Sequence, residues 1–432
     1  MADHNREHKK NARQIVKIKI KEIPYEELKK LKIPAYKKPH KPNPVLKKII
    51  NILSRTDLKK KHFKYESIGM DRLGKNEPCF ILMNHSSFVD LEIASYLLYP
   101  RSYQIVCTTD GFVGKEPLMR QIGCIPTLKY VMDVRLVKDM AYAVNELKTS
   151  VLMYPEAGYS FDGTASALPE SLGKCVKVLK VPLVIINTLG AFSSDPLYNM
   201  LQVRKVDISA KMEYVLSPEE IAEKSADEIN DIIKKYFTFD QFRWQQENHI
   251  RIDEPFRADG LNRVLYKCPH CNTEGKMVGK GIHLKCENCG ALYTLDEYGF
   301  LKGDNVEAKF DHVPDWYKWE RKCVRDELIN NEYHLRADVD IYMIVDTKYL
   351  YKVGSGVLEH SKEGFHLTGC DGKIDHYQKP SSSYSLNADY FWYEIGDMIG
   401  IGDMKNAYYC FPENCGDIVA KTRLAAEELY KL

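Results

Sequence analysis

The chain has 432 residues, 44% hydrophobic and 28% charged; this composition excludes a disordered chain and leaves room for two to four domains. The net charge of +2 is unevenly spread, because residues 1–62 hold 19 Lys and Arg against 6 Asp and Glu. This part therefore carries +13 and the remainder −11. A basic segment before a mildly acidic body predicts an anionic partner, either membrane headgroups or nucleic acid.

The first predicted unit is a basic arm that comprises residues 1–62. Residues 1–21 are polar and contain no apolar stretch of signal-peptide length, so no signal peptide is expected. Prolines interrupt the middle of the arm, and the apolar spacing of residues 45–54 then predicts an amphipathic helix. Two interpretations stay open: a solvated tail, or a peripheral membrane anchor in which each Lys or Arg near an anionic surface contributes roughly 1 kcal/mol.

Residues 63–255 alternate short apolar runs with helical patterns, which predicts an α/β domain. The apolar runs are continuous rather than alternating, as expected for strands that are covered on both faces. Ser225 and Glu228 have the spacing of a capping box at the start of a helix. The predicted strands are residues 79–83, 104–108, 151–154 and 183–187, and the predicted helices are residues 89–99 and 227–237.

The junction between the first predicted strand and its helix is the most informative segment of this domain. His85 follows the strand directly, at the carboxyl end where open α/β sheets bind ligands, and Asp90 lies one turn further along. A histidine can act as a general base near neutral pH, and a carboxylate on its second ring nitrogen fixes the tautomer. The ordinary alternatives are a turn histidine and a helix-capping carboxylate.

Four segments of this domain resemble, in order, the glycerolipid acyltransferase family of the bacterial lysophosphatidate acyltransferase type. The first block of that family is Asn-His-x-Ser-x-x-Asp, and the matching residues are Asn84, His85, Ser87 and Asp90. The segments similar to the second, third and fourth blocks are residues 123–129, 154–160 and 181–185. The resemblance covers about residues 63–240 and implies a mixed sheet flanked by helices.

The resemblance also implies an activity and roles for particular residues. A fatty acyl group would move from an acyl-thioester, acyl-CoA or acyl-ACP, to the hydroxyl of a lysophospholipid, with lysophosphatidate as the default acceptor. His85 would be the general base and Asp90 would orient it. The residues implied in substrate binding are Asn84, Ser87, Lys129, Pro155, Glu156 and Gly158.

The sequence departs from the family pattern where the phosphate of the acceptor would bind. Lys129 stands where the family usually has Arg; it supplies the charge but not the planar two-pronged donor. Tyr159 replaces the usual Arg of the third block, and Ala157 replaces its Gly. Because charged contacts to phosphate are the stronger kind, a glycolipid or another hydroxyl acceptor stays open as an alternative.

Residues 256–300 contain four cysteines in two CxxC pairs that are separated by 14 residues. Four thiolates fill the tetrahedral shell of zinc and leave no open position, so the pattern predicts a structural zinc ribbon. His270, inside the first pair, is the less favoured ligand. Because the 12 cysteines lack the pattern of a secreted disulfide framework, reduced thiols in the cytoplasm are expected. The predicted ligands are Cys268, Cys271, Cys286 and Cys289.

The last two predicted units are a helical linker and a small β-rich domain. Residues 301–336 form the linker, which contains Trp316 and Trp319. Residues 337–432 contain short apolar runs separated by turn residues and end in a helical pattern, which resembles a pleckstrin-homology-like barrel. The predicted strands are residues 341–345, 349–353, 364–368 and 390–394, and the predicted terminal helix is residues 415–432.

Two other functional classes stay open beside the enzyme. One is a non-catalytic lipid-binding scaffold, and the other is a zinc-ribbon nucleic-acid binder, which the few basic residues near the ribbon make unfavoured. A protein could bind the ribbon or the C-terminal domain. No run of 18 uncharged apolar residues occurs, so no transmembrane helix is expected; we expect a cytoplasmic protein held peripherally on the inner face of the membrane.

Overall fold

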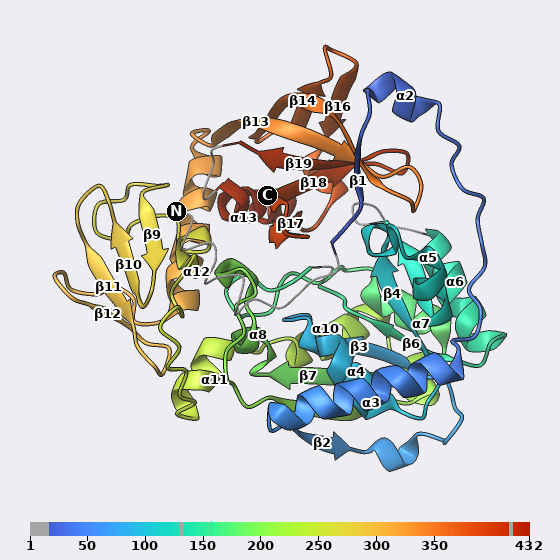
Figure 1. Ribbon diagram of the computed structural model, residues 1–432. Coiled ribbons are helices and arrows are strands. Elements are labelled where there is room, and N and C mark those ends of the chain that lie inside the picture. The colour runs from blue at the N-terminus through green and yellow to red at the C-terminus, as the bar shows by residue number, and fades with distance from the viewer. Residues whose placement is uncertain (1–16, 129–133, 157, 414–417) are drawn as a thin grey trace.

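The computed structural model describes residues 17–128, 134–156, 158–413 and 418–432 (Figure 1). These residues form a seven-stranded sheet with helices, a four-stranded sheet and an eight-stranded sheet. Within the described ranges no helix is both long and apolar enough to cross a lipid bilayer.

The seven-stranded sheet is mixed and has the order β2-β8-β7-β3-β6-β4-β5. All of its neighbouring pairs are parallel except β7 and β8, which are antiparallel. The predicted α/β class and mixed sheet are therefore present. The strands are β2 (Lys64–Ile68), β3 (Phe80–Met83), β4 (Tyr103–Thr108), β5 (Cys124–Thr127), β6 (Ser150–Met153), β7 (Leu183–Leu189) and β8 (Ser209–Leu216).

Helices cover both faces of this sheet, because its central strand is apolar at every position. Ile81 and Met83 of β3 pack with the face covered by α3 and α4, whereas Phe80 and Leu82 pack with the face covered by α6, α7 and α10. The predicted capping box of Ser225 is present at the start of α10. These helices are α3 (Pro44–Lys60), α4 (Val89–Leu98), α6 (Val134–Asn145), α7 (Leu172–Leu179) and α10 (Ala226–Tyr236). The shorter helices are α5 (Glu116–Gln121), α8 (Ala191–Ser194), α9 (Pro218–Glu223) and α11 (Gln241–Glu247).

The N-terminal segment from residue 17 onward differs from a solvated tail. Strand β1 (Ile20–Glu22) pairs in parallel with β14 (Leu350–Ser361) of the C-terminal sheet. After the short helix α2 (Tyr25–Lys29), the chain crosses to the mixed sheet, where Asn43 caps the long helix α3. The described part of the basic arm is thus attached to the folded body at both of its ends (Figure 1).

The four-stranded antiparallel sheet lies in the segment of the cysteine pairs, with Cys286 at the end of one strand, and a long helix follows it. Helix α12 (Val313–Ile329) begins in the predicted linker, and the indole N–H of Trp316 donates to the carbonyl of Lys267 at 3.0 Å. Trp316 is fully buried, so this helix packs tightly against the ribbon. The strands are β9 (Met277–Lys280), β10 (His283–Cys286), β11 (Leu292–Leu295) and β12 (Leu301–Gly303), in the order β12-β11-β10-β9.

The C-terminal sheet has the order β16-β15-β14-β13-β19-β18-β17, and β1 pairs with β14 beside this path. The predicted strand at residues 390–394 ends at Trp392, because Tyr393 and Glu394 have positive φ angles and form a turn. The pleckstrin-homology-like comparison stays a prediction. The remaining elements are β13 (His334–Met343), β15 (Gly364–Gly369), β16 (Ile374–Gln378), β17 (Asn387–Trp392), β18 (Gly396–Gly402), β19 (Ala407–Pro412) and α13 (Ile418–Lys431).

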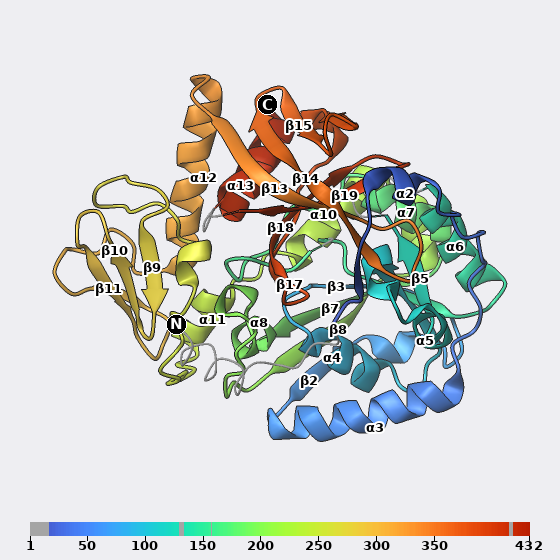
Figure 2. The same cartoon turned by 45° about the horizontal axis from the view of Figure 1, so that its top comes forward.

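The C-terminal sheet and the ribbon share one hydrophobic core with the α/β domain. Phe161 and Phe192 of the α/β domain, Tyr293 of the ribbon and Tyr390 of β17 belong to the same buried cluster. The rings of Phe161 and Tyr390 lie 4.3 Å apart. The C-terminal sheet therefore packs directly against the α/β domain and is not merely joined to it by a linker (Figure 2).

Candidate functional site

His85 and Asp90 lie together at the end of β3, in the turn that leads into α4. The Nδ1 atom of His85 is 3.1 Å from Oδ2 of Asp90, and the same oxygen accepts the backbone N–H groups of Ser86 at 2.7 Å and Ser87 at 3.0 Å. A carboxylate acceptor places the ring proton on Nδ1 and leaves a lone pair on Nε2. Asp90 is buried and the His85 side chain keeps 21% of its surface exposed, so the arrangement can accept a proton from a bound group.

Asn84 and Ser87 hold this turn from within the protein. The side chain of Asn84 accepts from the backbone N–H of Thr188 at 2.7 Å and donates to its carbonyl at 3.2 Å, which ties the turn to β7. The hydroxyl of Ser87 donates to Asp195 and accepts from the N–H of Val89 at 3.1 Å. Both side chains are buried, so these contacts orient the turn. Direct contact with a substrate, the role expected from the sequence, stays a prediction.

Two tyrosine rings stack on the imidazole of His85. The ring centroid of Tyr154 is 4.1 Å from that of His85, and the ring centroid of Tyr159 is 4.0 Å away. The plane of Tyr154 is inclined by 22° to that of His85 and the plane of Tyr159 by 30°, so both aromatic rings pack closely against the imidazole. Burial raises the pKa of both tyrosines well above 10, so both hydroxyls stay protonated. The sequence placed Tyr159 in the third block without indicating this contact.

Glu156 connects the histidine turn to the loop that follows β6. Its Oε2 accepts the backbone N–H of His85 at 3.0 Å, and its Oε1 accepts the backbone N–H of Ser166 at 2.7 Å. Burial raises the pKa of this carboxyl group to about 7, although both backbone hydrogen bonds and the nearby Arg423 act in the opposite direction. Glu156 thus lies beside His85, and both of these hydrogen bonds come from backbone N–H groups.

The other residues predicted to bind substrate are Pro155, Gly158 and Lys129, and the structure describes the first two. The carbonyl of Pro155 accepts from the hydroxyl of Tyr384 at 3.4 Å. Gly158 is half-buried, and a Cβ atom added there would meet nothing within 4 Å, so space alone does not require glycine. Lys129 and Ala157 lie outside the described residues.

The C-terminal domain contributes side chains that sequence reasoning missed. Arg423 of α13 donates to the carbonyl of Tyr159 at 3.1 Å, and the hydroxyl of Tyr393 donates to Asp110 at 3.3 Å. No local signal marks these residues, because each lies more than 200 positions from its partner. The site is therefore built from two parts of the chain.

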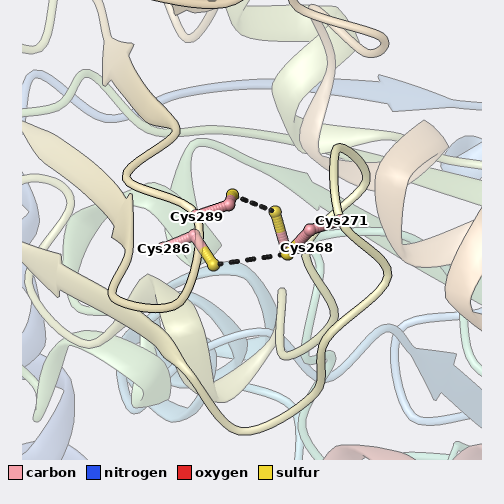
Figure 3. Close-up of side chains that lie close together, drawn as sticks. All are labelled: Cys268, Cys271, Cys286 and Cys289. Carbon is pink, nitrogen blue, oxygen red and sulfur yellow. Dashed lines mark hydrogen bonds between the residues drawn. The ribbon is translucent and has the colours of Figure 1, made fainter.

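The four cysteines of the ribbon converge on one point (Figure 3). Their sulfur atoms all lie within 4.8 Å of one another, and the pairs Cys268–Cys289 and Cys271–Cys286 are each 3.8 Å apart. A tetrahedron with zinc–sulfur bonds of about 2.3 Å has edges of about 3.8 Å, so this donor set fits zinc. The four cysteines can hold a metal ion, as the sequence predicted.

Comparison with protein-family models supports an acyltransferase domain in this part of the chain. The family model described as Acyltransferase matches residues 64–187. Among solved structures, the chain is similar to the 1-acyl-sn-glycerophosphate (LPA) acyltransferase PlsC from Thermotoga maritima, with 14% identity and a TM-score of 0.36. That likeness covers 44% of this chain and 76% of the other. A comparison with curated proteins gave no match.

Proposed function

We propose that this protein is a lipid O-acyltransferase in which His85 is the general base. The observation that carries the proposal is the contact between Nδ1 of His85 and the buried carboxylate of Asp90, which leaves Nε2 as a proton acceptor. The match of the Acyltransferase model to residues 64–187 supports the same chemistry.

The proposed reaction needs no nucleophile from the protein. The acceptor hydroxyl attacks the carbonyl carbon of an acyl-thioester, acyl-CoA or acyl-ACP, while Nε2 of His85 takes the hydroxyl proton. The new C–O bond forms, the C–S bond breaks, and the proton passes from the imidazolium to the leaving thiolate. Asp90 stabilises the imidazolium between these two transfers.

The proposed acceptor is a lysophospholipid, with lysophosphatidate as the default. Tyr159, which stands in place of an arginine, stacks on His85 and supplies no charge, which favours a glycolipid or another hydroxyl acceptor as the alternative. The counter-charge for a phosphate would have to come from Lys129 or from elsewhere in the site.

We also propose that α3 places the enzyme on an anionic membrane surface. The helix turns four apolar side chains toward solvent, at the spacing of one helical face, and turns the polar side chains of Asn51 and Ser54 inward. An exposed apolar face of this kind suits a lipid interface, where buried apolar area and nearby lysines act together. The exposed residues are Val45, Ile49, Ile52 and Leu53.

The zinc ribbon has a structural role in this proposal. When bound, zinc would hold the two CxxC turns together; the described ligands leave no coordination position for a substrate. Trp316 ties the first turn to α12, so the ribbon also supports the helix that packs against α13.

The test is a transfer assay with labelled acyl-CoA and acyl-ACP against a panel of lysolipids and glycolipids. The wild type should acylate at least one acceptor, and His85→Ala should lower the rate by at least 10³-fold while zinc content and melting temperature stay unchanged. His62→Ala is the matched control, because this exposed histidine pairs with Asp207 away from the site. Full transfer by His85→Ala would end the proposal, and lipid binding without transfer by the wild type would favour the scaffold alternative.

A further inference from the structure

The loop between β6 and α7 forms one wall of the candidate site, and it has little structure of its own. Its described residues from 154 to 171 contain no helix or strand, so its position depends on contacts with other segments. One contact is to the site itself, where the N–H of Ser160 donates to the carbonyl of His85 at 3.1 Å. Tyr159 and Glu156, which both touch His85, belong to this loop.

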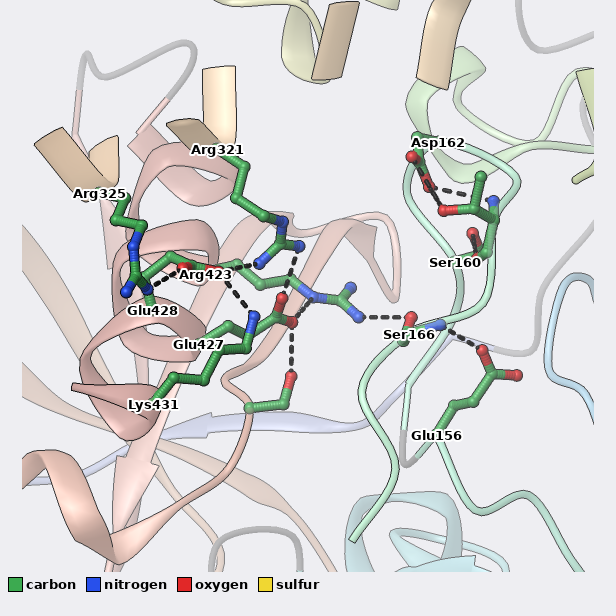
Figure 4. Close-up of polar contacts among 12 residues, drawn as sticks. Glu156, Ser160, Asp162, Ser166, Arg321, Arg325, Arg423, Glu427, Glu428 and Lys431 are labelled. Atoms are coloured by element: carbon green, nitrogen blue, oxygen red, sulfur yellow. Dashed lines mark hydrogen bonds and ion pairs between the residues drawn. The ribbon is translucent and has the colours of Figure 1, made fainter. Parts of the chain in front are cut away.

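Arg423 of α13 holds the same loop from the C-terminal domain (Figure 4). One terminal nitrogen donates to the carbonyl of Tyr159 at 3.1 Å, and the other donates to the hydroxyl of Ser166 at 2.8 Å. The guanidinium lies 4.3 Å over the ring of Phe161, and the residue is only 4% exposed. A single buried side chain therefore contacts three positions of the loop.

The guanidinium is itself held from the opposite side. Its Nε donates to Glu427 at 3.1 Å, and the same carboxylate pairs with Arg321 of α12 at 2.7 Å. Burial alone would raise the pKa of Glu427, but Arg321 and Arg423 hold it at about 2, so the carboxylate stays ionised. A planar group that donates in three fixed directions suits this position, and a lysine ammonium does not.

The contacts of Arg423 continue to the histidine turn by two routes. Ser166, whose hydroxyl accepts from Arg423, donates its backbone N–H to Oε1 of Glu156, and Oε2 of Glu156 accepts the backbone N–H of His85. Tyr159, whose carbonyl accepts from Arg423, stacks its ring on the imidazole. Both routes end at His85.

We propose that Arg423 is a positioning residue for acyl transfer, which lets the C-terminal domain set the geometry of the His85 site through the 158–166 loop. This inference rests on the proposed function. Arg423 does not touch the reacting atoms; it fixes the segment that packs against the imidazole and anchors its backbone. The C-terminal domain is thereby part of the active site and not an appendage.

The charge of Arg423 gives a second, separable effect. Glu156 is faced by Asp90 from α4, Tyr384 and Arg423 from the C-terminal domain, and the backbone N–H groups of His85 and Ser166. It accepts both N–H groups more strongly when it is ionised, because the protonated oxygen of a carboxyl group is the weaker acceptor. Because Arg423 lowers the pKa of this carboxyl group, loss of the cation should move the acid limb of the pH–rate profile to higher pH.

The experiment compares Arg423→Met, Arg423→Lys and Ser166→Ala in the full chain. We expect Arg423→Met to lower kcat at least tenfold and to move the acid limb upward, and Arg423→Lys to lower kcat while the acid limb stays in place. Ser166→Ala removes one contact and should lower kcat severalfold. Arg325→Met is the matched control, because this arginine joins α12 to Glu428 of the same terminal helix without touching the loop.

Hydrogen exchange of the loop supplies a readout that does not need activity. Amides of residues 158–166 should exchange faster in Arg423→Met than in the wild type and in Arg325→Met, while those of α7 stay unchanged. Wild-type exchange, kcat and pH profile in both Arg423→Lys and Ser166→Ala would overturn the inference, even if Arg423→Met fails to fold. An inactive wild type with faster loop exchange in the variants would instead count against the proposed function alone.

Discussion

Glu156 accepts the backbone N–H of His85 at 3.0 Å, so a buried carboxylate anchors the main chain of the residue proposed as the base. Its second oxygen holds the N–H of Ser166 at 2.7 Å. One carboxyl side chain therefore fixes two segments that are far apart in the sequence, and its protonation state affects both.

The first prediction concerns the pH dependence of stability at Glu156. Burial raises the folded-state pKa to about 7, above the ordinary value of 4.5, so this group favours the folded state below pH 4.5 and loses that contribution as pH rises to 7. The loss is on the order of 3 kcal/mol, at 1.36 kcal/mol per pKa unit. Glu156→Gln should remove it, and urea unfolding of both proteins between pH 4.5 and 8 measures the difference. Parallel curves for the two proteins would contradict the prediction.

The second prediction concerns the ring of Tyr159. Tyr159→Phe keeps the stack on His85 and should retain kcat within a factor of two to three. Tyr159→Ala removes a ring contact worth about 0.5–1.5 kcal/mol and frees the imidazole to rotate, so kcat should fall about tenfold or more. Steady-state kinetics of the two variants provide the check. Equal losses in both would assign the effect to the hydroxyl instead of the ring.

The third prediction concerns the exposed face of α3. Replacing Ile49, Ile52 and Leu53 together by Ser should weaken binding to anionic vesicles by about tenfold or more per side chain, because each apolar side chain contributes about 1.5–3 kcal/mol when it is buried. The melting temperature should not fall, since these side chains are exposed. Vesicle sedimentation across a salt series measures the effect, with Ile33→Ser as the control for an exposed isoleucine outside the helix. DNA binding at the same salt concentrations would instead indicate the nucleic-acid alternative.

The fourth prediction concerns the metal site. Cys286→Ser should reduce bound zinc from one equivalent to none and should lower the melting temperature, because the small ribbon has little core without its metal. Cys323→Ser on α12 removes a half-buried thiol outside the cluster and should leave zinc content unchanged. Metal analysis by mass spectrometry compares the two. Retention of zinc by Cys286→Ser would rule out the four-cysteine site.

The central sheet could be predicted because each of its inner strands contains a run of apolar residues. Strands β3, β4, β6 and β7 each contain an apolar run of at least three residues, whereas β2 is largely exposed and β8 alternates between buried and accessible positions. Strand β5 is a short segment that contains Pro126, which gave no strand signal. The strands that the sequence did not predict are therefore at the edges or near them, where one face meets solvent.

Some residues of the candidate site could likewise be predicted from the sequence, and others could not. His85, Asp90 and Glu156 carry local patterns, because a strand end and a helix start place them together. Arg423 carries none, since it contacts Tyr159 across 264 positions of the chain and its own neighbourhood reads as an ordinary helix. Packing between the domains, which no short motif encodes, brings it to the loop.

Strand β1, from the beginning of the chain, completes the sheet that contains β14, from near its end. During synthesis the pairing of Ile20 with Leu350 cannot form until β14, about 330 residues later in the chain, has been made. A ribosome-bound fragment that stops after the ribbon would lack both this pairing and the helix that reaches Tyr159. The contacts that α13 makes with the His85 site should consequently form only after that helix has been synthesised.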